Sequence, residues 1–463
     1  MSTLRRNEPR DRRALTHVGG PARTSGDPQA AALLATALDV EGSLTAEEAA
    51  RAHVHGFHSY PARMHPTTAR RLVETLSRPG DRVLDPFCGS GTVLVEARLA
   101  GREAWGVDAN PLAVRLAWLK ARGVGEAERG RFVEAARAVA AVADTRRKAR
   151  SGASRRYGPE DAALFEPHVL LELDGIRVGL DELPDEAARA ALELCLSAIL
   201  TKVSRRASDT AAHEQPRRIA AGYPARLFVR KAEELAARLA EIAPALAAAP
   251  TPALEEGDAR VLRGIPPASI DLVVTSPPYP GVYDYLAHHE ARLRWLRLPR
   301  ARFAEAEIGA RRSLDALGAD EGRARWQAEF GEVLAAMSKV LRPGGRAALL
   351  LADSVIAREP VLALDVVRAA APAAGLQLTA AASQERPHFH APSARAFDRS
   401  PRMEHAILLT RPDAPAPPPR RKLVPQRGPV KGSSRGPAKG PAGGPVKGSS
   451  RGPAKGPRRS GGS

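Results

Sequence analysis

The sequence is poor in cysteine and in aromatic residues, and these shortages exclude several classes of protein. Among 463 residues there are only two cysteines, Cys88 and Cys195, and aromatic residues make up 4%. Two thiols so far apart cannot build a disulfide framework or a four-thiolate zinc site, which favours a reducing, cytoplasmic compartment. Neither a run of 18 apolar residues nor the apolar core of a signal peptide is found, so we expect no membrane span and no export.

Acidic residues are also scarce, since 52 Asp and Glu stand against 70 Lys and Arg, a net charge of +18. Residues 412–463 hold twelve basic residues and one acid, Asp413, a surplus of +11 that leaves +7 for the rest of the chain. A polyanionic partner is therefore indicated mainly for this tail. The tail repeats one Gly/Pro/Ser/Lys sequence at 429–441 and 445–457 and has few apolar side chains, so we predict that it is disordered.

The pattern of apolar residues divides the chain into five predicted regions. Residues 1–50 are an N-terminal extension with no recognisable chemistry, and residues 51–120 read as strand, loop, helix and strand. Residues 121–250 have helical spacing and read as a helical insertion, with Phe228, Leu235, Leu239 and Ile242 on one helix face. Residues 251–411 alternate strands and helices, and 412–463 are the tail. This order predicts an α/β fold with a mostly parallel sheet and helices on both faces; the expected late strands are 271–275, 347–351 and 405–410.

The first motif is R-V-L-D-P-F-C-G-S-G-T at 82–92. An apolar strand leads into a loop with Gly89 and Gly91, where the backbone can approach a ligand closely, and a helix N-terminus follows. A second strand, A-W-G-V-D at 104–108, ends in Asp108, whose carboxylate can accept hydrogen bonds from both hydroxyls of a ribose. The pair of elements predicts a nucleoside-containing cofactor above the loop.

Two alternatives apply to this motif. Glycine-rich loops of this kind also occur in dinucleotide-binding domains, but Leu94 stands where the third glycine would be. Asp108 could instead cap the helix that begins near Pro111, although Asn110 offers the same capping group.

The second motif is D-L-V-V-T-S-P-P-Y at 271–279. A buried strand ends in two prolines, which fix an extended backbone and leave carbonyl groups able to accept hydrogen bonds. An exocyclic amine of a nucleobase is a poor nucleophile because its lone pair is delocalised into the ring. Acceptors from Ser276 and Pro277 would hold its N–H groups, and Tyr279 would stack on a base that has flipped out of the duplex. The alternative is a proline-rich turn with an incidental tyrosine.

Together, D-P-F-C-G-S-G-T, G-V-D-A-N-P and T-S-P-P-Y resemble the amino-methyltransferases that make N4-methylcytosine and N6-methyladenine in DNA. F-H-S-Y-P-A-R-M-H-P-T-T-A-R-R-L at 57–72 resembles the segment beside the cofactor's methionine end. L-R-P-G-G at 341–345 resembles the turn before the fifth strand of class I methyltransferases. The resemblance implies a class I methyltransferase fold, S-adenosylmethionine as cofactor and DNA as partner, with a cognate restriction nuclease as a further partner class.

The resemblance also implies roles for individual residues. Asp108 would meet the ribose and Asp258, in G-D-A-R, the adenine of the cofactor. The implied cofactor-binding residues are Asp85, Phe87, Gly89, Gly91, Thr92, Asp108 and Asp258, and the implied catalytic residues are Ser276, Pro277, Pro278 and Tyr279. Ser276 at the first catalytic position resembles the N4-cytosine branch, whereas the cofactor motif precedes the catalytic motif, opposite to the common order in that branch.

Three hypotheses follow. The first is a cytosine-N4 DNA enzyme, with adenine N6 as the alternative base; the second is the same chemistry on RNA, as in guanine-N2 methylation of transfer RNA. The third is a non-catalytic nucleic-acid-binding protein, which the intact Asp108, Ser276 and Tyr279 disfavour. The helical insertion either reads the target, with 204–210 and Arg217–Arg218 contacting phosphates, or only supports the core.

We expect no metal site and no covalent C5 chemistry. The histidines at 53, 55, 58 and 65 cluster in the sequence, but no cysteine or acid at a suitable spacing completes a ligand set. The Pro-Cys dipeptide of cytosine-C5 enzymes is absent as well. The charged segments Q-E-R-P at 384–387 and R-M-E-H at 402–405 flank late strands, and the sequence leaves open whether they meet solvent or substrate.

Overall fold

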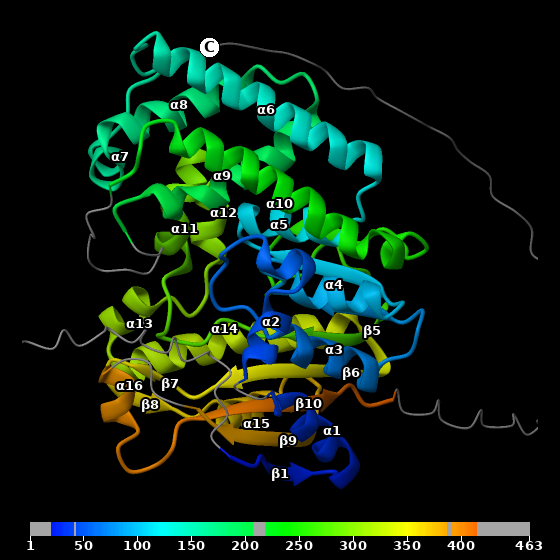
Figure 1. Ribbon diagram of the computed structural model, residues 1–463. Coiled ribbons are helices and arrows are strands. Elements are labelled where there is room, and N and C mark those ends of the chain that lie inside the picture. The colour runs from blue at the N-terminus through cyan, green and yellow to red at the C-terminus, as the bar shows by residue number, and fades with distance from the viewer. Residues whose placement is uncertain (1–19, 41–42, 207–217, 387–390, 414–463) are drawn as a thin grey trace, which may run out of the picture. The chain divides into compact units, whose positions relative to one another are not determined.

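A computed structural model describes residues 20–40, 43–206, 218–386 and 391–413 (Figure 1). The predicted disorder of the tail concerns residues 414–463, which lie outside the described residues. Residues 207–210 and Arg217, which were predicted to contact phosphates, also lie outside the described residues.

In the described part of the chain, eight strands form one sheet in the order β1-β9-β10-β6-β5-β2-β3-β4. The strands from β6 to β4 are mutually parallel, whereas β10 is antiparallel to β6 and β9, and β1 is antiparallel to β9. Their bounds are β1 (Arg23–Gly26), β2 (Arg82–Asp85), β3 (Glu103–Asp108), β4 (Ala253–Glu256), β5 (Ile270–Thr275), β6 (Leu341–Ala352), β9 (Gln377–Glu385) and β10 (Met403–Thr410). The predicted α/β fold with a mostly parallel sheet is confirmed.

Side chains alternate between the two faces of the sheet, and each face has its own apolar core. In β2, Val83 packs into one core and Leu84 into the other, as the two-residue period of a strand requires. The first core is covered by α1 (Pro28–Leu38), α3 (Pro66–Leu76), α4 (Thr92–Leu99) and α5 (Pro111–Ala121). The second is covered by α13 (Arg311–Leu317), α14 (Ala319–Val340) and α15 (Ala363–Ala370). Because both faces are covered, the central strands are buried almost throughout.

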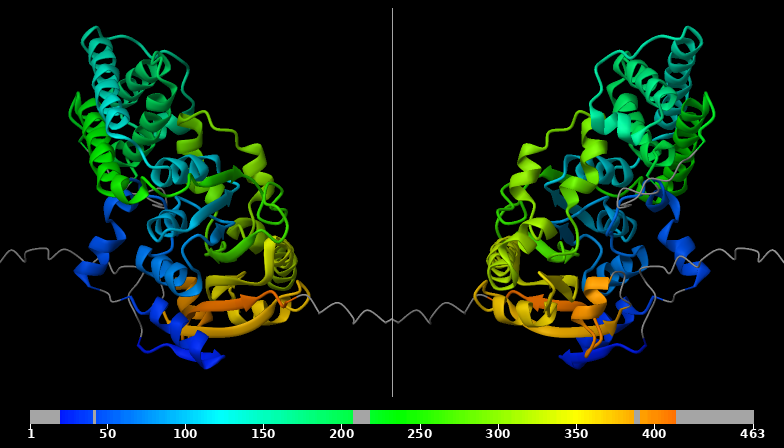
Figure 2. Two further views of the ribbon diagram at one scale, coloured as in Figure 1. Left: turned by 90° about the vertical axis from the view of Figure 1, so that its right-hand side faces the viewer. Right: turned by 90° about the vertical axis from the view of Figure 1, so that its left-hand side faces the viewer.

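The helical insertion forms one bundle beside the first core (Figures 1 and 2). It comprises α6 (Glu126–Lys148), α7 (Pro159–Leu164), α8 (Pro167–Asp181), α9 (Glu186–Val203) and α10 (Tyr223–Leu246). Helix α6 packs on α8 and α10, while α9 contacts α5 and α10 contacts α4. The predicted apolar face of α10 is confirmed, since Phe228, Leu235, Leu239 and Ile242 are all buried. No helix among the described residues is both long and apolar enough to cross a membrane.

Two segments differ from the sequence-based expectation. L-R-P-G-G at 341–345 was expected to be a turn, but β6 already begins at Leu341, which pairs with Ile270. The pairing shifts in register after Ile270 and Gly344 takes a positive φ of 71°, so the turn-forming residues sit inside an irregular strand start. The N-terminal extension, in turn, supplies β1 at the sheet edge and α1 in the first core.

The remaining described elements are short. They are α2 (Leu44–Ala50), the 3-10 helix η1 (His53–Gly56), α11 (Tyr285–Trp295), α12 (Ala301–Ala306), α16 (Ala391–Ala396) and a hairpin of β7 (Ser354–Ile356) and β8 (Glu359–Val361).

The strand order reverses between β2 and β5. From β2 the chain moves outward through β3 to β4 and then returns to the other side of β2 as β5. Ligands of open α/β sheets bind at such a switch point, outside the carboxyl ends of the strands. Here those ends are Asp85 and Thr275, the last residues before the two sequence motifs.

Candidate active site

The loop after β2 owes its shape to two glycines. Gly89 and Gly91 have positive φ angles of 50° and 85°, which residues with a side chain rarely adopt. A Cβ atom on Gly91 would also lie 2.8 Å from the Cα of Ala117 in α5. The loop therefore lies directly against α5, and the N-terminus of α4 points out of it.

Asp108, at the end of β3, holds this loop. Its Oδ2 accepts a hydrogen bond of 2.8 Å from the backbone N–H of Gly89, and its Oδ1 accepts one of 2.8 Å from the N–H of Asn110. Asn110 itself caps α5 by accepting from the N–H of Leu112 at 3.0 Å, so Asp108 is not the cap. Burial raises the pKa of Asp108 to about 6.

Asp85 joins the two motifs. Its Oδ1 accepts from the hydroxyl of Thr275 at 2.6 Å and from the N–H of Phe87 at 3.1 Å. Burial raises the pKa of Asp85 to about 7. Because Thr275 directly precedes the catalytic tetrapeptide, this buried hydrogen bond fixes the cofactor loop against the candidate catalytic segment.

A first cavity, the cofactor cavity, opens above the loop. Of the residues predicted to bind the cofactor, Phe87, Gly89 and Asp108 line it, and they are joined by Ser276 and Pro278 of the catalytic motif. Sequence reasoning missed most of its opposite wall, which consists of Tyr285, Phe303, Glu307 and Ile308; Tyr60 lies in the segment that the resemblance had placed near the cofactor.

The other predicted cofactor residues do not line this cavity. Asp85 and Thr92 are buried, and Gly91 packs against Ala117 of α5. Asp258 follows Gly257, which does line the cavity, but its own carboxylate is held by Arg260 at 2.7 Å in a neighbouring cavity. Its predicted contact with the cofactor's adenine stays a prediction.

A second cavity, the base cavity, adjoins the first. It is lined by Ser276, Pro277 and Tyr279 of the catalytic motif, by Tyr283, and by charged residues of the late strands. Ser276, Ala62 and Tyr285 line both cavities, so the two meet at Ser276. A ligand in one cavity and a ligand in the other would face each other across this residue.

A chain of hydrogen bonds leads from Ser276 to a partly buried ion pair. The Ser276 hydroxyl donates to the Tyr279 hydroxyl at 3.4 Å, which donates to Oε1 of Glu404 at 3.3 Å. Oε2 of Glu404 accepts from Nε of Arg386 at 2.7 Å. Burial, together with the charge of Glu404, raises the pKa of Tyr279 well above its usual value, so Tyr279 keeps its proton. Glu404 of R-M-E-H and Arg386 of Q-E-R-P line the base cavity.

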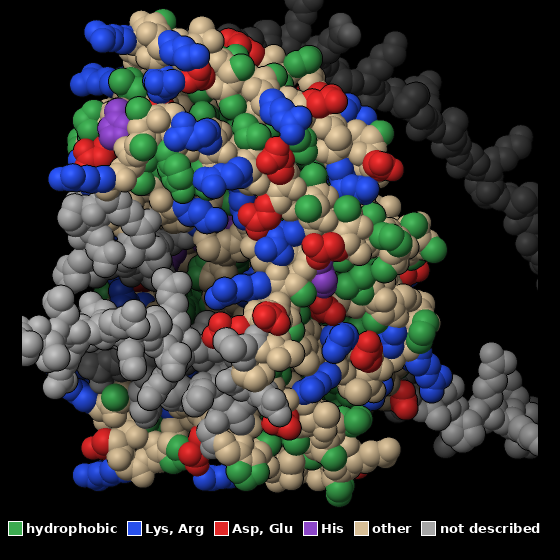
Figure 3. All heavy atoms as spheres, viewed as in Figure 1, with side chains coloured by type: hydrophobic (Ala, Val, Ile, Leu, Met, Phe, Trp, Pro, Cys, Tyr) green, Lys and Arg blue, Asp and Glu red, His purple; other side chains and the backbone are tan. Residues whose placement is uncertain are grey.

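The insertion presents a mixed surface. On the face in Figure 3, Lys and Arg side chains alternate with acidic ones. Pairs such as Arg137 with Glu233 at 3.0 Å and Arg131 with Asp185 at 3.1 Å neutralise part of the positive charge. Of the predicted phosphate contacts, Arg205 pairs with Glu166 at 3.1 Å, whereas Arg218 is exposed.

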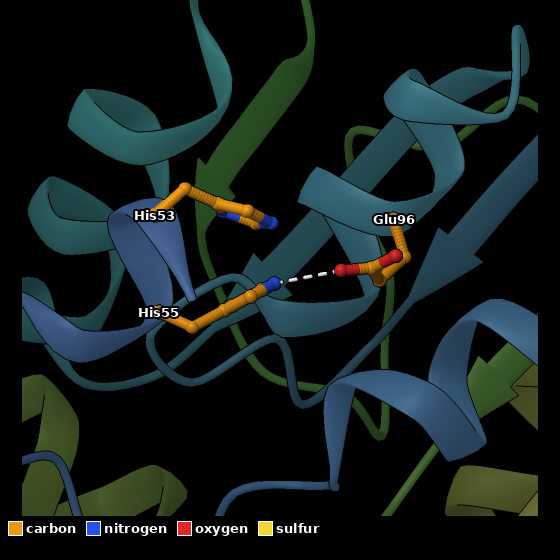
Figure 4. A group of neighbouring side chains, drawn as sticks. All are labelled: His53, His55 and Glu96. Atoms are coloured by element: carbon orange, nitrogen blue, oxygen red, sulfur yellow. Dashed lines mark hydrogen bonds and ion pairs between the residues drawn. The ribbon is translucent and has the colours of Figure 1, made fainter. Parts of the chain in front are cut away.

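The four clustered histidines have separate environments. His65 caps α3 through the N–H of Thr67, and the ring of His58 hydrogen-bonds to Ser197 at 3.0 Å. His53 and His55, however, lie beside Glu96 of α4 (Figure 4). Spacing along the sequence did not reveal this neighbour, because the fold brings Glu96 to His55 from 41 residues further along the chain.

Comparison with known proteins finds a family match in the first half of the core. Residues 40–118 match the family described as DNA methylase, the N6/N4 group. The predicted resemblance to the DNA amino-methyltransferases is confirmed. The matched segment contains Tyr60, Gly89 and Asp108, all of which line the cofactor cavity. The matching family supports S-adenosylmethionine as the cofactor, and the donors and acceptors around the cavity fit it.

The curated relatives of this chain are similar to it over short segments. The type II methyltransferase M.MjaII of Methanocaldococcus jannaschii is 33% identical over 82 residues, 18% of this chain and 16% of its own length. M.MvaI of Kocuria varians is 42% identical over 62 residues, 13% and 14% of the two chains. The tRNA (guanine(10)-N2)-dimethyltransferase of Methanothermobacter thermautotrophicus is 47% identical over 60 residues, which are 13% of this chain and 18% of its own length. The chain thus spans less than a fifth of the length of each.

Solved structures align more widely but weakly. TrmN from Thermus thermophilus has a TM-score of 0.31 and 16% identity, covering 76% of this chain and 50% of its own. The rRNA methyltransferase AviRa from Streptomyces viridochromogenes has a TM-score of 0.28 and 13% identity, and the alignment covers 81% of this chain and 94% of AviRa.

Proposed function

We propose that the protein transfers a methyl group from S-adenosylmethionine to an exocyclic amino group of a DNA base, with cytosine N4 as the acceptor. The observation that carries this proposal is the meeting of the cofactor cavity and the base cavity at Ser276. Ser276 at the first position of the tetrapeptide supports cytosine N4 over adenine N6. A type II methyltransferase acts beside a cognate restriction nuclease, which is the partner class that this function implies.

The cofactor supplies a methyl group on a positively charged sulfur. In this proposal Asp108, which lines the cofactor cavity, accepts from the ribose hydroxyls. Tyr279 and Tyr283 offer aromatic surfaces to a base that has left the duplex. Ser276 then holds the amine at the boundary of the two cavities, and the rate arises from this positioning rather than from a covalent intermediate.

The direction of the hydrogen bonds suits an amine substrate. The Glu404 carboxylate accepts from Arg386 through Oε2 and from Tyr279 through Oε1, so the Tyr279 hydroxyl donates to it and itself accepts from Ser276. The lone pairs of Ser276 Oγ then remain available to the N–H groups of the amine. We infer that Glu404 positions the protons of the tetrapeptide without touching the reacting atoms.

This inference makes a prediction for Glu404→Gln. The amide can donate to Tyr279, which would reverse the chain and turn the hydroxyl proton of Ser276 toward the amine. We expect kcat to fall by about tenfold with little change in the affinity for the cofactor, measured by single-turnover methylation and calorimetry. The matched control is Glu385→Gln, at an exposed ion pair with Arg23. Equal kcat values for Glu404→Gln and the unchanged protein would contradict the proton direction.

RNA is the second candidate substrate, because one curated relative is a tRNA guanine-N2 enzyme and its matched segment is the most identical of the three. The test uses the full chain with labelled S-adenosylmethionine and, separately, duplex DNA and bulk transfer RNA. Digestion and mass analysis are expected to show N4-methylcytosine in the DNA arm. N6-methyladenine or N2-methylguanine would reassign the substrate, and the absence of label in both arms would refute the proposed activity.

The basic tail yields a quantitative prediction for DNA binding. Each neutralised phosphate adds about 0.9 to the slope of log affinity against log salt, so a tail that engages four phosphates contributes about 3–4. Deleting residues 412–463 should make the slope shallower by that amount and leave the methylated base unchanged. Arg411 stays, since its carbonyl accepts from the N–H of Gly344. A slope that is the same with and without the tail would show that it does not contact DNA.

A further inference from the structure

We propose that His53, His55 and Glu96 form a binding site for one divalent transition-metal ion, with zinc as the best fit. Nε2 of His55 lies 2.7 Å from Oε1 of Glu96, and one ligand atom from each of the three residues lies within 4.8 Å of the other two. Figure 4 shows both imidazole rings directed toward the carboxylate. Among the described residues this is the only such group of three.

The donor set selects the metal. Two imidazoles and one carboxylate are a ligand set that zinc accepts, with water as the fourth ligand. Magnesium and calcium prefer oxygen donors, so the two histidines disfavour them. A cavity of about 340 Å³, lined by His53 and Glu96, reaches the cluster and would admit that water.

Burial, unpaired ring nitrogens and backbone strain distinguish this cluster from an ordinary hydrogen-bonded contact. His55 is 0% exposed and Glu96 is 5% exposed, and Nδ1 of both His53 and His55 is buried without a hydrogen-bond partner. His53 also has a φ of 34°, a left-handed backbone that costs free energy for a residue with a side chain. Strain and unpaired polar atoms of this kind concentrate at functional sites. The binding free energy of an ion would offset part of the free energy that they cost.

Cationic side chains stand near the cluster. Lys120 acts electrostatically on both histidines, and its Nζ is buried without a hydrogen-bond partner. Burial lowers the pKa of Lys120 well below its usual value. Arg63 donates to the carbonyl of His55, and Arg238 donates to the carbonyl of His53. Arg70 and Glu74, which line the adjoining cavity, carry opposite charges.

The position of the cluster indicates what the metal does. Glu96 lies on α4, the helix that follows the glycine loop, and the histidines begin the segment that leads to Tyr60. Tyr60 lines the cofactor cavity, stacks on His289 at 4.7 Å and accepts from Asn110 at 3.3 Å. A metal bridging η1 and α4 would therefore hold one wall of the cofactor cavity against the helix that carries the loop.

The test is metal binding by the full chain, which does not depend on the proposed methyltransferase activity. Protein stripped with a chelator is titrated with Zn²⁺, Co²⁺ or Mg²⁺ alone, and we follow binding by calorimetry, the melting temperature, and the visible absorption of Co²⁺. We expect one Zn²⁺ or Co²⁺ per chain, a rise in melting temperature, and no binding of Mg²⁺ beyond exposed carboxylates.

Two variants and one control complete the test. Glu96→Gln keeps the shape of the side chain, and His53→Asn suits the positive φ at this partly exposed position. Both variants should weaken Zn²⁺ binding by about 100-fold, because each loses one of the three ligands. His168→Asn, in α8 of the insertion, should bind as the unchanged protein does. Zinc binding of the same strength in all four proteins, or none in any, would overturn the proposal. Circular dichroism of the metal-free variants separates lost binding from lost folding.

Discussion

Replacing Ser276 with alanine is expected to lower the rate of methyl transfer by at least about 100-fold, because the acceptor that holds the amine between the two cavities is lost. Tyr279→Ala should have an effect of similar size, since it removes the aromatic surface of the base cavity and the next member of the hydrogen-bond chain. The affinity for S-adenosylmethionine should change by less than about threefold in both variants, because most of the cofactor cavity is untouched. Single-turnover kinetics and calorimetry measure the two quantities separately.

The control for these variants is Ser338→Ala in α14, a serine on the helix that covers the second core. Tyr279→Phe separates stacking from hydrogen bonding, because it keeps the ring and removes only the hydroxyl that bonds to Glu404. A rate for Ser276→Ala close to that of Ser338→Ala would remove the tetrapeptide from the mechanism.

The second large effect is expected at Asp108. Asp108→Ala should weaken S-adenosylmethionine binding by about 2–3 kcal/mol, the loss of charge-assisted hydrogen bonds to two hydroxyls. The N–H of Gly89 also loses its acceptor, so the melting temperature of the ligand-free variant must be measured alongside. Unchanged affinity in calorimetry would place the cofactor elsewhere.

Asp108 also predicts how binding depends on pH. Burial raises the pKa of this carboxyl to about 6 in the ligand-free protein, so it is ionised above that pH and increasingly protonated below it. Hydroxyl donors need the ionised form, and cofactor affinity should therefore be constant above about pH 7 and fall as the pH drops through 6. Asp108→Asn has no proton to gain and should lack this fall; the same fall in the variant would assign it to another group.

The sequence predicted the elements that carry local patterns. The strands ending at Asp85, Asp108 and Thr275 follow from short apolar runs, and the glycine loop follows from positions that need positive φ angles. These strands then meet because the chain reverses its strand order at one place, a topology that the alternation of strands and helices implies.

Contacts across long stretches of chain could not be predicted. Glu404 meets Tyr279 from 125 residues away, and Glu96 meets His55 from 41 residues away. Both acids look like ordinary charged residues beside a strand or in a helix, and only tertiary packing makes them parts of a site. The sequence also did not predict that Phe303 and Ile308 form part of the cavity wall. Single apolar residues in short helices and loops show no hydrophobic periodicity from which a buried face could be inferred.

The hydrogen bond between Asp85 and Thr275 spans 190 residues of chain, and this separation has a consequence during synthesis. At translation rates of about 5–20 residues per second, the ribosome needs roughly 10–40 s to make that stretch. During this interval the glycine loop has been synthesised while β5, the strand that completes the sheet beside it, has not. The nascent chain is therefore expected to bind cofactor only after the helical insertion has been translated, and the insertion sets the delay between the two halves of the site.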